Sequence, residues 1–320
     1  MTRIVYLGFP TAAIAGGQKM ILRHVETLRD LGFEAVMRRT SQSVMPTWLE
    51  HRAPVEIDTD PQADDILVVP SDAPNAIARL ATLPQRALIF CQNQFSLAVV
   101  GAPAIDALPP GRLPGFISPG RVCAESIVGL YPEAQVEVIP CFADERIFRA
   151  AGPRQDAVVA VPRKRPTEDQ AIRGFLARRH PQHADLPWRV VANAAEQELA
   201  ATLAASTLFL SLSRFEAVGM TPLEAMASGC VCAGFLGVGG REFATPANGF
   251  WAPDDDLEAA ADALAQAADL AASGGPRLAA YHAAAAETAR AWSYAAFRVA
   301  LEEVWMRLAP EARRQSGPLD

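Results

Sequence analysis

Two acidic side chains flank a short glycine-containing segment in the second half of the sequence. Glu216 and Glu224 are separated by seven residues, and Gly219, Met220 and Thr221 lie between them. Glycine has no Cβ, so the backbone can approach a ligand closely at that point. Carboxylates accept hydrogen bonds from paired hydroxyls such as those of a sugar or a ribose. The spacing therefore favours a site for a hydroxyl-rich ligand.

The elements around this segment indicate what else the ligand carries. The apolar run 207–213 predicts a strand, and after a loop the sequence predicts a helix with Thr221 as N-cap and Pro222 at the first helical position. Unpaired N–H groups and the positive end of the dipole at such a helix start suit a phosphate or diphosphate. The alternative is a capping box between Thr221 and Glu224, which needs no ligand.

The flanking residues extend this pattern into a longer motif. It comprises the segments 216–224, 224–233, 239–242 and 248–249. The motif resembles that of retaining glycosyltransferases of the GT-B architecture, in particular glycosyltransferase family 4. In that family the first glutamate contacts the donor sugar, the second holds the ribose, and the backbone amides between them meet the diphosphate. The resemblance implies these roles for Glu216, for Glu224, and for the stretch formed by Gly219, Met220 and Thr221.

Three consecutive cations, Arg163, Lys164 and Arg165, follow another predicted strand. A basic turn in solvent is one interpretation. The other is that a forked arginine and a lysine offset the charge that develops on a departing diphosphate. Members of the resembled family usually carry an arginine and, some residues later, a lysine at this place. Here the cations are adjacent, which leaves open which of the three meets which phosphate.

The amino-terminal part offers weaker signals. Gly16 and Gly17 precede a predicted helix at 18–31, without the glycine pattern of dinucleotide-binding proteins, and Arg38 follows the second predicted strand where a nicotinamide enzyme would need an acid. A turn is the simplest interpretation. The resemblance implies that this glycine loop reaches the cleft and contributes to donor binding. The polar segment 91–95 follows a strand and is a candidate acceptor contact.

Short apolar strands alternate with helices along the whole chain, which predicts an α/β fold with parallel sheets covered on both faces. With the resemblance, this implies a GT-B architecture of two Rossmann-like, doubly wound domains facing across a cleft. The segment 141–152 predicts a hinge with a short helix. The expected domains are an acceptor-side domain at 1–148, a nucleotide-sugar domain at 149–290, and a carboxy-terminal helix at 291–320 that crosses back to the first domain.

The composition excludes several classes of protein. Half of the 320 residues are hydrophobic, a fifth are charged, and the net charge is -7, which argues against nonspecific nucleic-acid binding. The five histidines lack metal-like spacing, so we expect no metal site and no cofactor. Neither a signal peptide nor a membrane-spanning run is evident. We expect a cytoplasmic protein, with a peripheral contact at the inner face of a membrane left open. The five cysteines should be buried free thiols: Cys91, Cys123, Cys141, Cys230 and Cys232.

The resemblance implies a retaining glycosyltransferase that moves a sugar from a nucleoside-diphosphate sugar to a hydroxyl acceptor. The acceptor would be a glycan, free, lipid-linked or protein-linked, in the synthesis of a bacterial polysaccharide or glycoconjugate. Glu216, Arg163 and Lys164 would be catalytic. Two alternatives stay open: a nucleotide-sugar epimerase of GT-B shape, and a GT-B protein that binds a nucleotide sugar or a partner without turnover. Shared motifs do not select the nucleotide, the sugar or the linkage.

Overall fold

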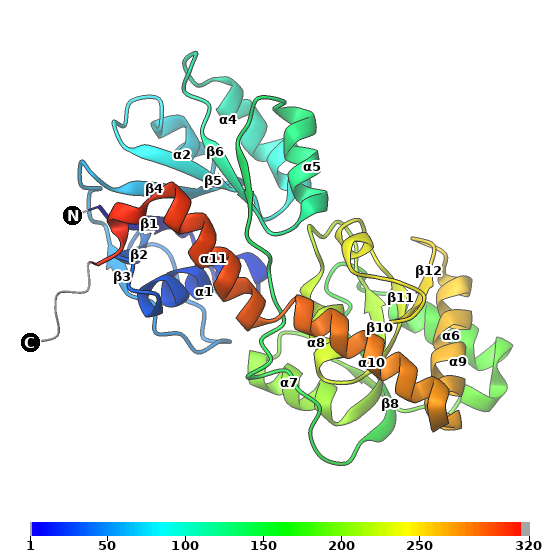
Figure 1. Ribbon diagram of the computed structural model, residues 1–320. Helices are drawn as coiled ribbons and strands as arrows, with labels where there is room; N and C mark the ends of the chain where they lie inside the picture. Colours follow the sequence, from blue (N-terminus) through cyan, green and yellow to red (C-terminus); the bar gives the residue numbers. More distant parts are fainter. Residues whose placement is uncertain (1, 315–320) are drawn as a thin grey trace, which may run out of the picture. The chain divides into compact units, whose positions relative to one another are not determined.

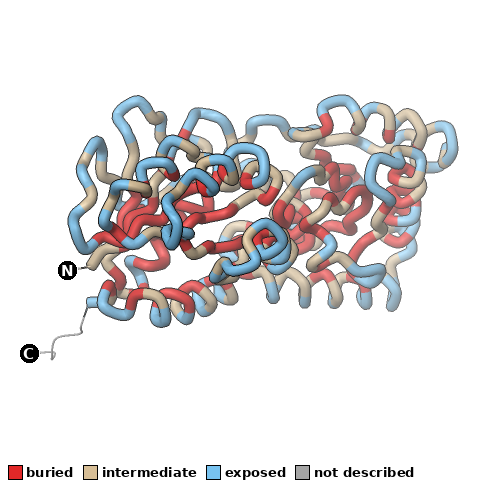
Figure 2. The backbone as a smooth tube through the Cα atoms, turned by 90° about the horizontal axis from the view of Figure 1, so that it is seen from above, coloured by how far each residue is buried: buried red, intermediate tan, exposed pale blue. Residues whose placement is uncertain are grey.

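The chain forms two compact units, each built on its own parallel sheet (Figure 1). A computed structural model describes residues 2–314. Unit 1 contains the residues up to Pro140 together with those from Phe297 onward, and unit 2 contains Cys141–Ala296. Figure 2 shows buried residues along the strands of each sheet and exposed ones along loops and outer helix faces. The expected α/β class with two doubly wound sheets is confirmed.

Unit 1 contains a sheet that has seven strands within the described residues, in the order β3-β2-β1-β4-β5-β6-β7, all parallel. Its elements are β1 (Ile4–Leu7), α1 (Gly16–Asp30), β2 (Ala35–Arg39), β3 (Val55–Ile57), β4 (Ile66–Pro70), α2 (Pro74–Arg79), β5 (Arg86–Phe90), α3 (Gln94–Ser96), the π-helical η1 (Leu97–Gly101), α4 (Ala102–Asp106), β6 (Gly115–Ser118), α5 (Arg121–Leu130), β7 (Val136–Val138), η4 (Pro310–Ala312) and α11 (Tyr294–Leu308), whose first three residues belong to unit 2.

The winding of this sheet reverses between β1 and β4, because the chain first builds outward through β2 and β3 and then returns to the other side of β1. All five residues of β4 are buried, as expected for a central parallel strand covered on both faces. Ligands of such sheets bind outside the carboxyl ends of the strands near the reversal. The residues directly after β1, β4 and β5 are therefore the candidates for ligand contact in this unit.

The core of unit 1 contains a fully buried histidine. The Nδ1 atom of His24 lies 2.9 Å from the hydroxyl of Tyr6, and its ring packs against those of Phe90 and Phe297. Tyr6 also packs against Trp305 of α11, so α1 and α11 lie over the same region of the sheet. Burial disfavours the charged imidazolium and lowers the pKa of His24 to about 3.

This histidine should make unit 1 sensitive to acid. Below about pH 6.5 the unfolded chain binds a proton at His24 that the folded chain does not bind, so the free energy of unfolding falls as the pH is lowered toward about 3. Between about pH 7 and about pH 5.5, we expect the free energy of unfolding of His24→Gln to fall by about 1 kcal/mol less than that of the wild type. Urea unfolding of both proteins measures it, and parallel stability curves would contradict it.

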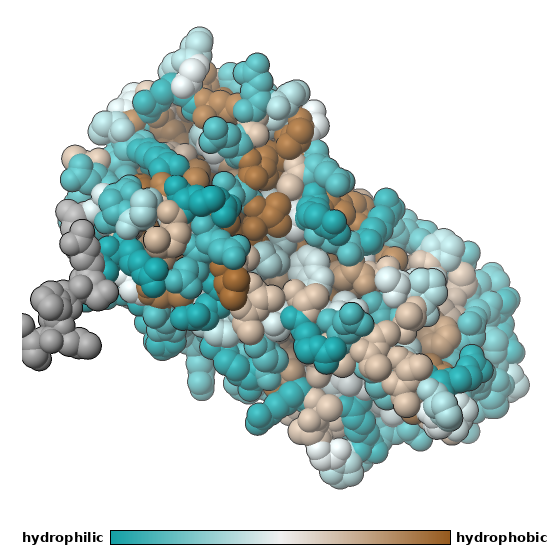
Figure 3. Space-filling model, viewed as in Figure 1, coloured by the Kyte–Doolittle hydropathy of each residue, from teal (hydrophilic) through white to brown (hydrophobic). Residues whose placement is uncertain are grey.

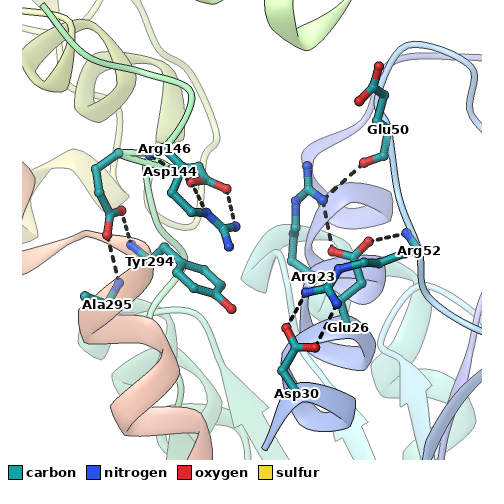
Figure 4. A network of polar contacts seen from close by, with 10 residues as sticks. Arg23, Glu26, Asp30, Glu50, Arg52, Asp144, Arg146, Tyr294 and Ala295 are labelled. Carbon is teal, nitrogen blue, oxygen red and sulfur yellow. Dashed lines mark hydrogen bonds and ion pairs between the residues drawn. The ribbon is translucent and has the colours of Figure 1, made fainter.

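The loop after β2 is fastened to α1 by a buried ionic network (Figure 4). The guanidinium of Arg23 donates to the Glu26 carboxylate at 2.9 Å and to the carbonyl of Glu50 at 3.1 Å. The other carboxylate oxygen of Glu26 accepts the backbone N–H of Arg52 at 2.6 Å, and the Arg52 side chain pairs with Asp30. Because Arg23 and Glu26 are buried, their charges are compensated by each other and by this loop.

Unit 2 contains a second parallel sheet, which has five strands in the part of the chain that the structure describes, in the order β12-β11-β10-β8-β9. Its elements are β8 (Gln155–Ala160), α6 (Glu168–Arg179), η2 (Pro181–His183), β9 (Trp188–Val190), α7 (Glu196–Ala204), β10 (Ser206–Leu212), α8 (Met220–Ala227), β11 (Val231–Phe235), η3 (Gly239–Glu242), β12 (Phe250–Ala252), α9 (Leu257–Ser273) and α10 (Gly275–Ala291).

Helices cover both faces of this sheet. Helices α6 and α9 pack together on one face, and α8 packs against α7 and α10 on the other. The side chain of Asn248 is 2 % exposed and bonds to Phe243, Thr245 and Thr288, so it serves the fold. Asp256 caps α9, because its carboxylate accepts the N–H of Ala259 at 2.9 Å.

The segment that enters unit 2 does not contain the short helix expected between residues 141 and 152. That expectation is wrong, since the segment forms turns held by side chains. Arg146 donates twice to Asp144, at 2.7 and 2.6 Å, and its guanidinium lies 3.4 Å from the ring centroid of Tyr294. The carboxylate of Glu145 accepts the N–H groups of Tyr294 and Ala295 at the start of α11. The backbone makes one helix-type bond, from the N–H of Phe148 to the carbonyl of Asp144 at 2.7 Å, and does not continue as a helix.

All five cysteines are buried and free, as expected. Burial raises the pKa of the Cys230 thiol to about 12, which keeps it protonated and unreactive. None of the helices between residues 2 and 314 has the length and apolar character needed to span a bilayer.

Candidate functional site

The loops after β8, β10 and β11 meet at the carboxyl edge of the unit 2 sheet. These strands are direct neighbours, so the residues that follow them are brought together although they are distant in the sequence. Arg163 and Lys164 follow β8, Glu216 follows β10, and Gly239 lies after β11. Such an edge is where doubly wound sheets bind ligands.

The structure brings three of the expected site residues together. The ammonium Nζ of Lys164 lies 3.0 Å from the Oε1 atom of Glu216 and donates to the carbonyl of Phe215 at 3.1 Å. The same Oε1 atom lies 3.7 Å from Nη2 of Arg163. All three side chains are partly exposed: 47 % for Arg163, 29 % for Lys164 and 26 % for Glu216. The cluster therefore carries one net positive charge and remains accessible to a ligand.

Arg165 has a different place. Its side chain is 1 % exposed, donates to Glu168 at 2.9 Å and to Asp255 at 2.6 Å, and lies over the ring of Phe235. Its Nε also approaches the carbonyl of Ser213 at 3.4 Å. With these partners, the guanidinium of Arg165 connects the loop after β8 to Ser213 after β10 and to Asp255 before α9. Of the three consecutive cations, Arg163 and Lys164 are the ones on the accessible side.

The loop that carries Glu216 is also fixed from β11. The N–H of Gly239 donates to the carbonyl of Glu216 at 3.1 Å. A Cβ on Gly239 would lie 2.1 Å from the carbonyl oxygen of Ala217 and 2.4 Å from the nitrogen of Val218. Only glycine permits this approach of the two backbones. Gly239 thus sets the position of the Glu216 backbone.

Helix α8 begins earlier than the sequence predicts. Gly219 is its N-cap with φ +92°, and Met220 is the first helical residue, so Thr221 is not the N-cap and Pro222 is not at the first position. No side chain caps this end. The prediction failed because glycine adopts the left-handed conformation at little cost and so lets the helix start two residues sooner. The N–H groups of the first turn, which include Met220 and Thr221, have no partner within the helix.

The second acidic residue lies deeper than the first. Glu224 is in α8 and is 5 % exposed, whereas Glu216 stands at the loop surface. Because the N-cap is Gly219 and not Thr221, Glu224 lies beyond the first turn, and the capping box expected between Thr221 and Glu224 does not form. Its role toward a ribose stays a prediction.

Gly16 and Gly17 lie in unit 1, in the first turn of α1 after the loop that follows β1. The side-chain amide of Gln92 donates to the carbonyl of Gly17 at 2.9 Å, and a Cβ on Gly17 would lie 2.4 Å from its Oε1 atom. Nearby in the sequence, Gln94 is 5 % exposed, and neither atom of its amide has a hydrogen-bond partner in the described part of the chain. The polar segment after β5 therefore supports the glycine turn of α1.

Two of the three histidines of unit 2 pair with carboxylates. His180 lies 2.6 Å from Asp262, and His183 lies 2.8 Å from Asp269. The partners of Asp262, chiefly the hydrogen bond from Arg179, lower the pKa of its carboxyl to about 2. Within residues 2–314 no group of three His, Cys, Asp or Glu side chains has a geometry that could hold a metal ion.

Two features of this site have no signal in the sequence. Phe215 has φ +50°, a left-handed conformation that a bulky residue rarely adopts, and nothing in the residues around it predicts that. The approach of Gly239 to Ala217 also depends on the neighbouring positions of β10 and β11. Glycines at 239 and 240 are visible in the sequence, but which of them makes the contact is not.

Comparison with known proteins gives a consistent picture. Residues 165–269 match the family model described as "Glycosyl transferases group 1". The chain is 24 % identical over 275 residues to an α-1,6-glucosyltransferase of Actinobacillus pleuropneumoniae serotype 7, and the match covers 83 % of each protein.

Solved structures with the same fold include sucrose-phosphate synthase from Thermosynechococcus elongatus, with a TM-score of 0.72, 13 % identity, and coverage of 97 % of this chain and 100 % of that one. HepE from Anabaena in complex with UDP gives a TM-score of 0.67 and 15 % identity, with 95 % and 100 % coverage. A second structure of HepE contains UDP-glucose, with a TM-score of 0.65, 14 % identity, and 95 % and 99 % coverage.

Proposed function

We propose a specific reaction for this chain, which is a glycosyltransferase of the GT-B fold with a group 1 glycosyltransferase domain at residues 165–269. In this reaction a sugar moves from a nucleoside-diphosphate sugar to a hydroxyl of an acceptor with retention of the anomeric configuration. The observation that carries the proposal is the cluster of Arg163, Lys164 and Glu216 at the carboxyl edge of the unit 2 sheet. The expected activity class is confirmed, whereas retention rests on the resemblance to family 4.

The donor assignment follows from the charge of the site and from the related proteins. A nucleoside diphosphate presents two or more negative charges, and positive groups at this edge include Arg163, Lys164 and the start of α8, with Arg214 in the loop after β10. The related α-1,6-glucosyltransferase and the UDP and UDP-glucose complexes of HepE make UDP-glucose the first donor to test. The diphosphate would lie against the Gly219, Met220 and Thr221 backbone. Glu224 would bind the ribose.

The rate enhancement would come from electrostatics and positioning. As the glycosidic bond breaks, negative charge grows on the departing diphosphate. Arg163 and Lys164, which are already positioned beside it, would stabilise this charge. Glu216 would bind hydroxyls of the donor sugar and keep its anomeric carbon aligned. The acceptor hydroxyl would enter on the leaving-group face and give its proton to a phosphate oxygen. No cofactor takes part, because the nucleotide sugar is itself a substrate.

The acceptor is expected at unit 1. The polar segment 91–95 follows β5 at the carboxyl edge of its sheet, and the amide of Gln92 there would bind acceptor hydroxyls, whereas the turn formed by Gly16 and Gly17 is assigned to the donor. A glycan, lipid-linked or protein-linked, of a bacterial polysaccharide or glycoconjugate fits this role. The five reduced cysteines fit a cytoplasmic enzyme, and a peripheral membrane contact would bring it to a lipid-linked acceptor.

Ligand binding and product configuration test this proposal. In a thermal-shift panel of UDP-, GDP- and dTDP-sugars, one nucleotide series should raise the unfolding temperature, because a ligand at about 100 times its Kd adds about 2.7 kcal/mol of stability. NMR of the product formed with that donor should show the anomeric configuration of the donor. Inversion would overturn retention, and a panel without any stabilising nucleotide would overturn the donor assignment.

The same experiment separates the alternatives. A nucleotide-sugar epimerase would convert the donor to its epimer in the absence of acceptor. A binding protein without turnover would be stabilised by the nucleotide and transfer nothing to any acceptor. We favour transfer because Lys164 and Glu216 form an accessible ion pair in which both side chains can exchange partners with a ligand.

A further inference from the structure

Phe215 has three properties that bear on the site. Its backbone is left-handed with φ +50°, its side chain is 55 % exposed, and it directly precedes Glu216. Exposure by itself indicates little, because single apolar residues are common on protein surfaces. Figure 3 shows apolar side chains interspersed with polar ones on the face in view of both units. The backbone conformation is the distinguishing property.

The left-handed conformation is imposed by contacts on either side of Phe215. Its carbonyl accepts the ammonium of Lys164 at 3.1 Å, and the next carbonyl, that of Glu216, accepts the N–H of Gly239 at 3.1 Å. On the amino-terminal side, Arg165 approaches the carbonyl of Ser213 at 3.4 Å. The loops after β8 and β11 thus fix the backbone around Phe215. Conformations of this kind persist where the surroundings over-determine them, and they cluster at functional sites.

The side chain is also braced by its neighbour. The guanidinium carbon of Arg214 lies 5.3 Å from the ring centroid of Phe215, and Arg214 is itself within 4 Å of Glu168 and Asp255. A cation over one region of an aromatic ring restricts how that ring turns. The structure therefore holds an aromatic surface in a defined place and leaves more than half of it open to solvent, beside a carboxylate.

We propose that Phe215 is a specificity-determining residue whose ring packs against the apolar C–H face of a pyranose while Glu216 binds the hydroxyls of the same sugar. The inference rests on the proposed function of this site. A pyranose has an apolar face and a rim of hydroxyls, which match an exposed ring and an adjacent carboxylate. The pyranose belongs either to the donor or to the acceptor, and the kinetic constants of the two substrates distinguish them.

The test removes or restores the aromatic ring of Phe215 and leaves the other residues of the site unchanged. Phe215→Ala and Phe215→Gly remove it, and Phe215→Tyr restores an aromatic surface. For Ala and Gly we expect the KM of one substrate, donor or acceptor, to rise about three- to tenfold, and for Tyr to stay near the wild-type value. The affinity for UDP, which has no pyranose, should stay within about twofold in all three. Val190→Ala, at an equally exposed apolar side chain of unit 2, is the matched control.

A second measurement examines the backbone separately. Glycine adopts positive φ freely, so Phe215→Gly should unfold at a higher temperature than Phe215→Ala, although both lose the ring. The reverse order would contradict the strained conformation on which the inference depends. Unchanged KM values for both substrates in variants that still bind UDP and transfer sugar would overturn the inference alone. A wild-type chain that binds no nucleotide would overturn the proposed function, and this inference with it.

Discussion

Replacing Glu216 with glutamine should lower kcat by about two to three orders of magnitude, while UDP binds as tightly as before or more tightly. Under the proposed function the loss is expected because the amide would not accept hydrogen bonds on both atoms from the donor sugar. The affinity for UDP should be maintained because the carboxylate that neutralises Lys164 at 3.0 Å is removed, which leaves more positive charge for the diphosphate. The gain should be modest, since both side chains are partly exposed.

Steady-state kinetics and calorimetry with UDP measure the two effects separately. Glu258→Gln is a matched control, because this carboxylate is on α9, exposed, and paired with Arg179 away from the loops of the site. Its kcat should equal that of the wild type within about twofold. If Glu216→Gln weakened UDP binding about tenfold without affecting kcat, Glu216 would contact the nucleotide and not the transferred sugar.

Gly239→Ala should weaken UDP binding about tenfold or more and reduce the free energy of unfolding by about 1 to 3 kcal/mol. The new methyl group would lie 2.1 Å from the carbonyl oxygen of Ala217 and 2.2 Å from its carbon, which are backbone atoms that cannot turn aside. The chain between Glu216 and Gly219 would have to shift. This shift would move both the carboxylate and the start of α8.

Gly240→Ala is the control for this substitution, since it adds the same methyl group one residue later. There the closest atoms are the Cβ and Cδ2 of Leu236, at 3.3 and 3.4 Å, so the neighbour has to move by only a few tenths of an ångström. We expect Gly240→Ala to lose less than about 1 kcal/mol of stability and to bind UDP as the wild type does. Equal effects of the two substitutions, measured by urea unfolding and calorimetry, would show that the approach of Gly239 to Ala217 does not position the site.

The regular elements were largely predictable from the sequence. The strand predicted at 207–213 is β10, which begins and ends one residue earlier, and the helix predicted at 18–31 is α1, which begins two residues earlier and ends one residue earlier. These elements have buried apolar runs or clear helix ends, and such signals are local. The short edge strands β3 and β12 were not predicted, because each has only three residues and only Ala252 among these six is buried. Their pairing with β2 and β11 is what makes them strands.

The residue types of the site were also visible in the sequence, but their partners were not. Glu216, Lys164 and Arg163 were identified from spacing and resemblance, and the structure places both cations within 4 Å of the Glu216 carboxylate. No local signal in the sequence showed which of the three consecutive cations would be buried and which would be accessible. Arg165 is buried because its partners, Asp255 and Ser213, come from other loops, and it pairs with Asp255 across 90 residues of sequence.

The sequence by itself determined the α/β class, the order of most strands and helices along the chain, and the acidic and basic residues available for chemistry. Hydrophobic periodicity and turn residues act over a few positions, so they are readable without a fold. The tertiary structure alone decided the early start of α8 at Gly219, the left-handed backbone of Phe215 and the pairing of Lys164 with Glu216. These features arise where the ends of β8, β10 and β11 meet, because strand order brings together residues that no local pattern connects.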